Sequence, residues 1–342
     1  MSLHTRNQYR KGWLLGLGLL LASALLVLLG VAVGSTGFES VLHMQNDPQA
    51  LQIVREIRLP RTLGAWLAGA LFGLAGAVAQ GLFRNPLADP YLLGSASGAL
   101  LGETVAVVLL GISPMAAHWL ARIGLTSAAF VGAVAAVLLT LLLANGVQHT
   151  LRLLLAGVVV GVVLGAVSSL LLLINPDIMQ AMQSFMLGST AFVDWTACAV
   201  MAAVLAASLV AAWMMSHVLD GLALGESTAQ SLGLDLPQMR LALIAVLALA
   251  TGTTVAQTGL IAFVGLAAPH LVRSVVKTTH GRLIVLSALM GAVLLMAADI
   301  LARWLMAPQE LPVGVLTAVL GGGYLLWLMH RQTGSGARGA VL

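Results

Sequence analysis

Long apolar segments alternate with short polar ones along almost the whole chain. A helix of about 20 apolar residues crosses the roughly 30 Å hydrocarbon core of a bilayer, and most of these segments reach that length. Breaks at clusters of charge, Pro and Asn divide the chain into ten such segments: 12–33, 61–83, 92–111, 119–144, 151–174, 195–217, 241–258, 260–275, 283–303 and 312–330. The pattern predicts an all-α polytopic membrane protein with about ten transmembrane helices.

The segment 260–275 differs from the others in length and polarity. It is short and contains Gly265, Pro269, His270 and Arg273. A helix that faces lipid does not readily hold such residues, so we expect this segment to be buried in protein or partly re-entrant.

Two polar stretches, 175–194 and 218–240, mix apolar residues at helical spacing with Gly and Pro, and we expect short interfacial helices in both. In the first stretch, Met179, Met182 and Met186 have the spacing of one helix face, which would lie over the pore mouth if the chain forms a pore. Methionines at these positions either adapt to a bulky apolar ligand or fill a core. The Gly-rich end, 333–342, is expected to be disordered.

Composition supports a membrane protein with closely packed helices. Of the residues, 60% are apolar and 8% are charged, whereas a soluble domain carries charge on about a quarter of its residues. The 37 glycines favour helix association through small residues. The 16 basic residues are scattered between the segments, so the net charge of +4 does not indicate a nucleic-acid partner.

Basic residues also predict the orientation. Most Lys and Arg fall on the side of the N-terminus, which the positive-inside rule places in the cytoplasm. Arg55, Arg58 and Arg61 are an exception, because they cluster on the opposite side. Anchoring to lipid headgroups and contact with a partner protein both remain open as explanations.

The sequence contains no motif for ATP hydrolysis and no candidate metal or cofactor site. The phosphate-binding motif is absent, and the two lysines, Lys11 and Lys277, do not follow a glycine-rich loop. The single cysteine, Cys198, lies in an apolar segment and offers neither a disulfide nor a multi-cysteine metal site. We therefore predict no enzymatic activity for this chain.

Two further readings rest on residues inside the segments. Ser95 and Ser97 weakly resemble the motif of an intramembrane serine protease, although small residues that pack a helix entry explain them more simply. An ion-coupled secondary transporter would need several intramembrane charges, and only Glu103 lies well inside a segment. We expect Glu103 to face the helix bundle and to be hydrogen-bonded.

Five motifs occur in an order that resembles a known family. They are Arg58-Leu59-Pro60-Arg61; Asn85-Pro86-Leu87-Ala88-Asp89-Pro90 with Leu93-Gly94; Leu224-Gly225-Glu226 with Leu232-Gly233; Gly259-Leu260-Ile261-Ala262-Phe263-Val264-Gly265-Leu266 with Pro269-His270; and Glu310-Leu311-Pro312-Val313-Gly314. Together they resemble the permease subunits of the FecCD family of ABC importers, which carry ferric siderophores, haem or cobalamin across the inner membrane. The resemblance covers almost the whole chain.

This resemblance implies a single permease domain, 1–342, in a bacterial inner membrane, with its N-terminus in the cytoplasm. It implies a two-fold homodimer with the translocation path between the subunits, two copies of a cytoplasmic ATP-binding subunit and a periplasmic substrate-binding protein. An iron chelate, either a ferric siderophore or haem, is the favoured substrate. Cobalamin is the alternative, and an ion-coupled transporter is the more distant one.

The resemblance also assigns roles to particular residues. Coupling helices that dock into the ATPase match 220–233, with Leu224, Gly225, Glu226, Leu232 and Gly233 as their motif residues. Docking of the binding protein is assigned to Arg58, Arg61 and Arg303. Asp299 lies one helical turn before Arg303, and a pair between them would either aim the arginine outward or neutralise it internally.

Overall fold

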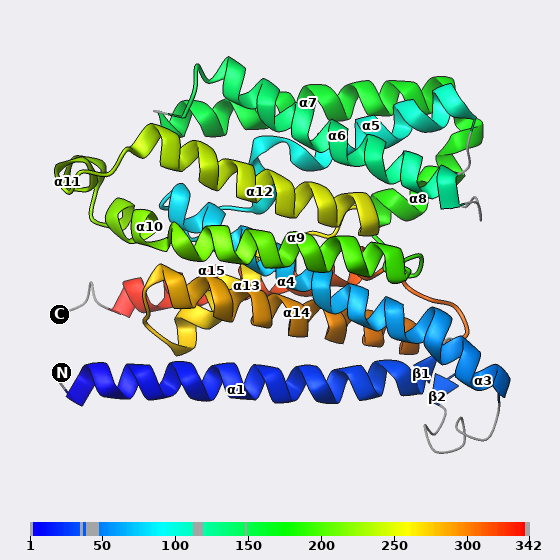
Figure 1. Ribbon diagram of the computed structural model, residues 1–342, viewed down its shortest axis with the longest axis horizontal. Helices are drawn as coiled ribbons and strands as arrows, with labels where there is room; N and C mark the ends of the chain where they lie inside the picture. Colours follow the sequence, from blue (N-terminus) through cyan, green and yellow to red (C-terminus); the bar gives the residue numbers. More distant parts are fainter. Residues whose placement is uncertain (1–2, 35–36, 39–47, 112–118, 148, 339–342) are drawn as a thin grey trace.

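The computed structural model describes residues 3–34, 37–38, 48–111, 119–147 and 149–338. Most of its helices run side by side along the long axis of the molecule (Figure 1). The described strands are one short antiparallel pair, β1 Val33–Gly34 and β2 Gly37–Phe38. The protein is therefore all-α, as the hydrophobic pattern predicts.

Each of the ten predicted segments corresponds to a helix. Among the described residues, seven stretches are long and apolar enough to cross a membrane, and two shorter apolar helices, Ser95–Leu110 and Val313–Trp327, match two further segments. The short helix Val264–Val275 matches the remaining segment. The ten helices are α1 Leu3–Ala32, α4 Leu59–Leu82, α5 Ser95–Leu110, α6 Trp119–Leu143, α7 Thr150–Ile174, α9 Trp195–Met214, α12 Leu236–Thr258, α13 Val264–Val275, α14 His280–Trp304 and α15 Val313–Arg338.

Two boundaries differ from the sequence pattern. The second span does not begin near Pro60, because α3 Pro48–Ile53 and the π-helix η1 Val54–Arg58 continue directly into α4. Pro60 lies in the first turn of α4, where its missing N–H costs little. At the other end of the chain, α15 continues past residue 333, where we expected the helix to have ended. The disorder of the tail stays a prediction, and 339–342 lie outside the described residues.

The short helices lie at the two ends of the bundle (Figure 1). We call one end the α11 end, where α10 Ser216–Ala223 and α11 Glu226–Ser231 lie near both termini. The other is the α8 end, with η3 Pro176–Ile178, α8 Met179–Leu187, β1, β2 and α3. The expected short helices in the two polar stretches are thus confirmed.

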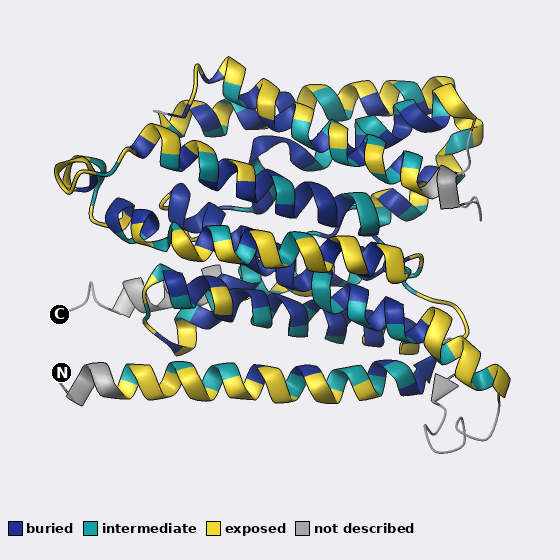
Figure 2. Ribbon diagram, viewed as in Figure 1, coloured by how far each residue is buried: buried dark blue, intermediate teal, exposed yellow. Residues whose placement is uncertain are grey.

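Helix α4 forms the centre of the bundle, whereas α1 lies at its edge with one side exposed (Figure 2). Glycines on α4 bring neighbouring backbones very close. A Cβ atom added to Gly69, Gly73 or Gly76 would lie 2.3, 2.0 or 1.7 Å from the carbonyl oxygen of Gly291, Ser287 or Gly265, respectively. Only glycine fits at these three positions, so α4 packs directly against the backbones of α14 and α13.

The short helix α13 is buried, as its composition predicts. Its 12 residues span about 18 Å at 1.5 Å per residue, which is too short to cross a bilayer. The residues just before it are held by the Tyr91 hydroxyl, which donates a hydrogen bond to the carbonyl of Ile261 at 2.9 Å. Tyr91 belongs to the 3-10 helix η2 Pro90–Leu93, so the motif at residues 85–94 positions the segment before α13.

Candidate functional site

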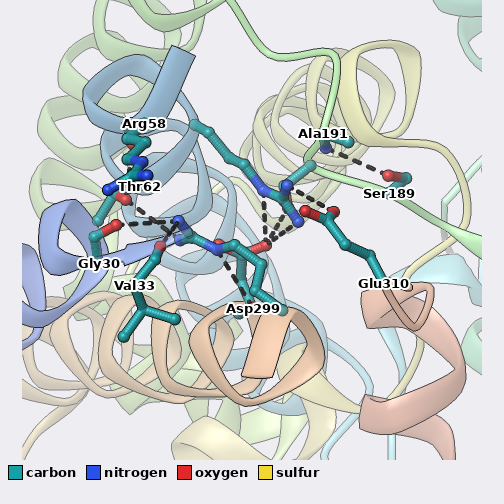
Figure 3. A network of polar contacts seen from close by, with 11 residues as sticks. Gly30, Val33, Arg58, Thr62, Ser189, Ala191, Asp299 and Glu310 are labelled. Carbon is teal, nitrogen blue, oxygen red and sulfur yellow. Dashed lines mark hydrogen bonds and ion pairs between the residues drawn. The ribbon is translucent and has the colours of Figure 1, made fainter. Parts of the chain in front are cut away.

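A network of buried charges lies at the α8 end, around the carboxylate of Asp299 on α14 (Figure 3). Asp299 is 0% exposed. Its Oδ1 accepts hydrogen bonds from Nε and Nη2 of Arg61, both at 3.2 Å, and another from the Thr190 hydroxyl. Its Oδ2 pairs with Nη2 of Arg303, one helical turn later. One carboxylate thus binds two guanidinium groups from different helices.

Arg303 connects this network to the first helix. It is 1% exposed, and its Nη1 donates to the carbonyls of Gly30 at 2.9 Å and Val33 at 3.3 Å. Its Nη2 also donates to the Thr62 hydroxyl at 3.2 Å. The sequence pattern identified the pair with Asp299, but it did not identify the contacts with the end of α1. Those contacts depend on tertiary packing and leave no local signal in the sequence.

The other two predicted arginines are also buried at this end. Arg61 reaches a second carboxylate, because its Nη1 lies 2.7 Å from Oε2 of Glu310. Arg58 donates from Nη1 to the carbonyl of Val31 at 3.3 Å. The structure therefore brings Arg58, Arg61 and Arg303 together, but their guanidinium groups contact this chain's own acceptors and are largely covered. Their role in docking stays a prediction.

At the α11 end, Glu226 joins three parts of the chain. Its Oε1 lies 3.1 Å from Nη2 of Arg84, just after α4, and 2.6 Å from Nη2 of Arg240 in the first turns of α12. Arg240 is buried, whereas the Arg84 and Glu226 side chains are partly exposed. Glu226 is the first residue of α11, so this carboxylate fixes the short helix against the ends of two long ones.

The apolar residues of this segment divide into two groups. Leu222 and Ala229 are buried in the core, whereas Leu224 and Leu232 are 67% and 64% exposed. All four belong to the stretch whose apolar residues recur at helical spacing, and that spacing alone does not separate the two groups. Gly225 and Gly233 follow these two leucines with positive φ angles of 107° and 81°. The glycines allow sharp turns that leave both leucines on the surface.

A second contact holds the same region against α14. Asp220 on α10 accepts hydrogen bonds through Oδ1 from the backbone N–H of His280 at 3.0 Å, and it lies 2.7 Å from Nδ1 of the same residue. The two short helices are therefore attached to α4, α12 and α14 through polar side chains. Exposed apolar side chains on an element fixed in this way are suited to a protein partner.

The three methionines at the α8 end do not share one environment. Met179 and Met186 are exposed, whereas Met182 is 0% exposed and belongs to the hydrophobic core. In this chain Met182 therefore fills a core position. A role of these residues at the pore mouth stays a prediction for Met179 and Met186, whose side chains remain accessible.

Comparisons with known proteins agree with the sequence motifs. Residues 19–331 match the model of the FecCD transport family. The chain is 37% identical to the hemin transport system permease protein HmuU of Yersinia pestis, over 92% of this chain and 96% of that one. It is 38% identical to the vitamin B12 import system permease protein BtuC of Escherichia coli, over 95% and 97% of the two chains.

A solved structure shares the fold as well. A metal-chelate type ABC transporter in an inward-facing conformation superimposes with a TM-score of 0.82 at 28% identity, and the match covers 92% of this chain and 98% of that one.

Proposed function

Because the chain belongs to the FecCD transport family, we propose that it is the membrane-spanning subunit of an ABC importer, acting as a homodimer with two ATP-binding subunits and a substrate-binding protein. The observation that carries this proposal is the α11 end, where two exposed leucines follow directly after short helices that Glu226 and Asp220 fix to the bundle. An element of this kind can receive force from a partner without being displaced from its own subunit. ATP hydrolysis would then occur in the partner.

The proposed substrate is a bulky metal chelate, with a ferric siderophore or haem preferred and cobalamin as the alternative. Similar relatives include a hemin permease and vitamin B12 permeases, and the similar structure is of the metal-chelate type. Uptake into vesicles that contain the reconstituted transporter and its own binding protein, measured with haem, a ferric siderophore and cobalamin in parallel, distinguishes these substrates. Uptake of none of the three would contradict the substrate class.

The purified chain is expected to hydrolyse no ATP by itself, because its sequence lacks a phosphate-binding motif. Activity should appear when the ATP-binding subunit is added, and substrate import should require hydrolysis. The measurement is phosphate release from proteoliposomes with and without that subunit. A partner variant unable to hydrolyse ATP is the control. Sustained phosphate release by the chain alone would refute the assignment of ATP hydrolysis to a separate subunit.

We also propose that the α8 end docks the binding protein, with Arg58, Arg61 and Arg303 supplying positive potential beneath the surface. These arginines together with Asp299 and Glu310 carry three positive and two negative formal charges, which favours an acidic partner. Replacing Arg58 with Gln should weaken docking by no more than about fivefold, the effect of about 1 kcal/mol. The effect should shrink as salt rises.

Binding-protein association measured by surface plasmon resonance at two salt concentrations checks this prediction. Arg152→Gln is the matched control, because Arg152 is an exposed arginine at the start of α7, near the opposite end. Equal association of both variants and the unchanged chain would contradict the docking assignment. It would favour anchoring of the α8 end to lipid headgroups.

A further inference from the structure

A cavity of about 990 Å³ lies within this single chain, between α5, α6, α8, α9 and α12. Its volume is at the upper end of the range of about 300 to 1,000 Å³ that is usual for small-molecule sites. The described lining residues include none of the three methionines predicted for the pore mouth, and none from α7 or α15. The cavity is therefore separate from the features on which the import proposal rests.

Glu103 on α5 lines this cavity. It is 6% exposed, and its buried Oε2 has no hydrogen-bond partner among the residues that the structure describes. We expected a hydrogen-bonded Glu at this position, so the structure corrects that expectation for one of the two oxygens. A carboxyl oxygen in a low-dielectric environment costs free energy unless a donor or a cation meets it. A ligand can supply the missing group.

The other lining residues indicate the charge and shape of such a ligand. Asp194 is a second carboxylate in the described lining, which includes no Lys, Arg or His. Phe130, Phe185 and Phe192 also line the cavity, and the faces of aromatic rings attract cations. The cavity thus favours a positive group, and the described part of its lining offers no cationic side chain to meet a phosphate.

The exposed part of the lining indicates the route of entry. Ile123, Val131, Phe192 and Val200 all line the cavity and are among the exposed large apolar residues. Val131 and Val200 belong to α6 and α9, which are both candidate membrane spans. The opening is therefore apolar and faces the side of the bundle that the lipid would cover, so a ligand needs an apolar body to enter.

We propose that this cavity is a binding site for an amphipathic amine, an apolar chain with one protonated amino group and no phosphate, that enters from the lipid phase and pairs with Glu103. The hydroxyl groups of Ser127 and Thr253 and the amide of Gln257 line the same cavity and can accept the remaining ammonium hydrogens. The proposal concerns a site in the single chain and holds whether or not the import proposal is correct.

The probe is dodecylammonium, with dodecanol as the neutral ligand of equal chain length. Binding to the full chain in phosphatidylcholine nanodiscs is measured by displacement of a fluorescent alkylamine. The unchanged chain should bind dodecylammonium more tightly than dodecanol. Glu103→Gln should weaken dodecylammonium binding by about 30-fold or more, because one partner of a buried charge pair is lost, and should leave dodecanol binding unchanged.

Two further variants keep the result interpretable. Val204→Trp places a large ring in the cavity and should weaken the binding of both probes. Asp177→Gln removes an exposed carboxylate outside the cavity lining and should change neither. Equal loss of dodecanol and dodecylammonium binding in Glu103→Gln would overturn the proposal, and so would no loss at all. Displacement of the probe by phosphatidylethanolamine would contradict a phosphate-free ligand.

Discussion

Replacing Asp299 with Ala is expected to destabilise the protein more than any other single change at the α8 end. The variant leaves the guanidinium groups of Arg61 and Arg303 buried without their shared carboxylate. Removing one partner of a buried ion pair typically costs about 3 to 5 kcal/mol. We expect a large fall in the amount of folded protein and in the unfolding temperature, measured by size-exclusion fluorescence of a tagged chain in detergent.

Asp177→Ala is the control for this prediction, since Asp177 is an exposed carboxylate in η3 at the same end. A second variant separates lost charge balance from lost packing. Arg61→Met and Arg303→Met combined with Asp299→Ala should recover part of the stability, because no guanidinium group then remains buried without its carboxylate, and Glu310, which loses Arg61, is partly exposed. If Asp299→Ala alone unfolds at the same temperature as the unchanged chain, the network does not stabilise the α8 end.

Replacing Glu226 with Arg is expected to reduce ATP-driven import by about tenfold or more, because placing like charges together costs several kcal/mol. The new side chain would lie beside Arg84 and Arg240, where the structure now has a carboxylate between two guanidinium groups. Helix α11 should then move away from the ends of α4 and α12. Import into proteoliposomes and co-purification of the ATP-binding subunit are the two measurements.

Thr228→Arg is the matched control for this variant. Thr228 lies on the same short helix two residues after Glu226, is exposed, and gives the same new charge on the opposite side of the helix. We expect it to retain most of the import activity. If Glu226→Arg imports substrate as fast as Thr228→Arg does, then the contact with Arg84 and Arg240 does not position the coupling segment.

The spans could be predicted from the sequence because each crossing requires an apolar segment of nearly fixed length. The same reasoning identified α13 as unusual, since Pro269 and Arg273 are out of place in a helix that faces lipid. The start of the second span was missed because the apolar segment was expected to begin at residue 61, just after Pro60. A π-helical turn immediately before α4 lets the helix continue through that point.

The candidate sites were predicted less completely. The family resemblance pointed to Glu226 and Arg303, but not to their partners at long sequence distance, Arg84, Arg240 and the carbonyl of Gly30 on α1. Burial of the arginines at the α8 end could not be predicted either, because it depends on which segments cover them. Helical spacing could not separate the buried Leu222 from the exposed Leu224, since the turns at the glycines interrupt the periodicity.

The glycine contacts of α4 have a mechanical consequence. Where backbones are in contact without side chains between them, two helices have little freedom to slide or to repack. We therefore expect α4, α13 and α14 to move together as one rigid body. A force that the ATP-binding subunit exerts on α11 would be transmitted through Glu226 to Arg84, at the end of α4. Helix α4 carries Arg61 near its opposite end. Spin-label distances between α4 and α14 should therefore stay constant through the ATP cycle, while those between α4 and the exposed helix α7 change.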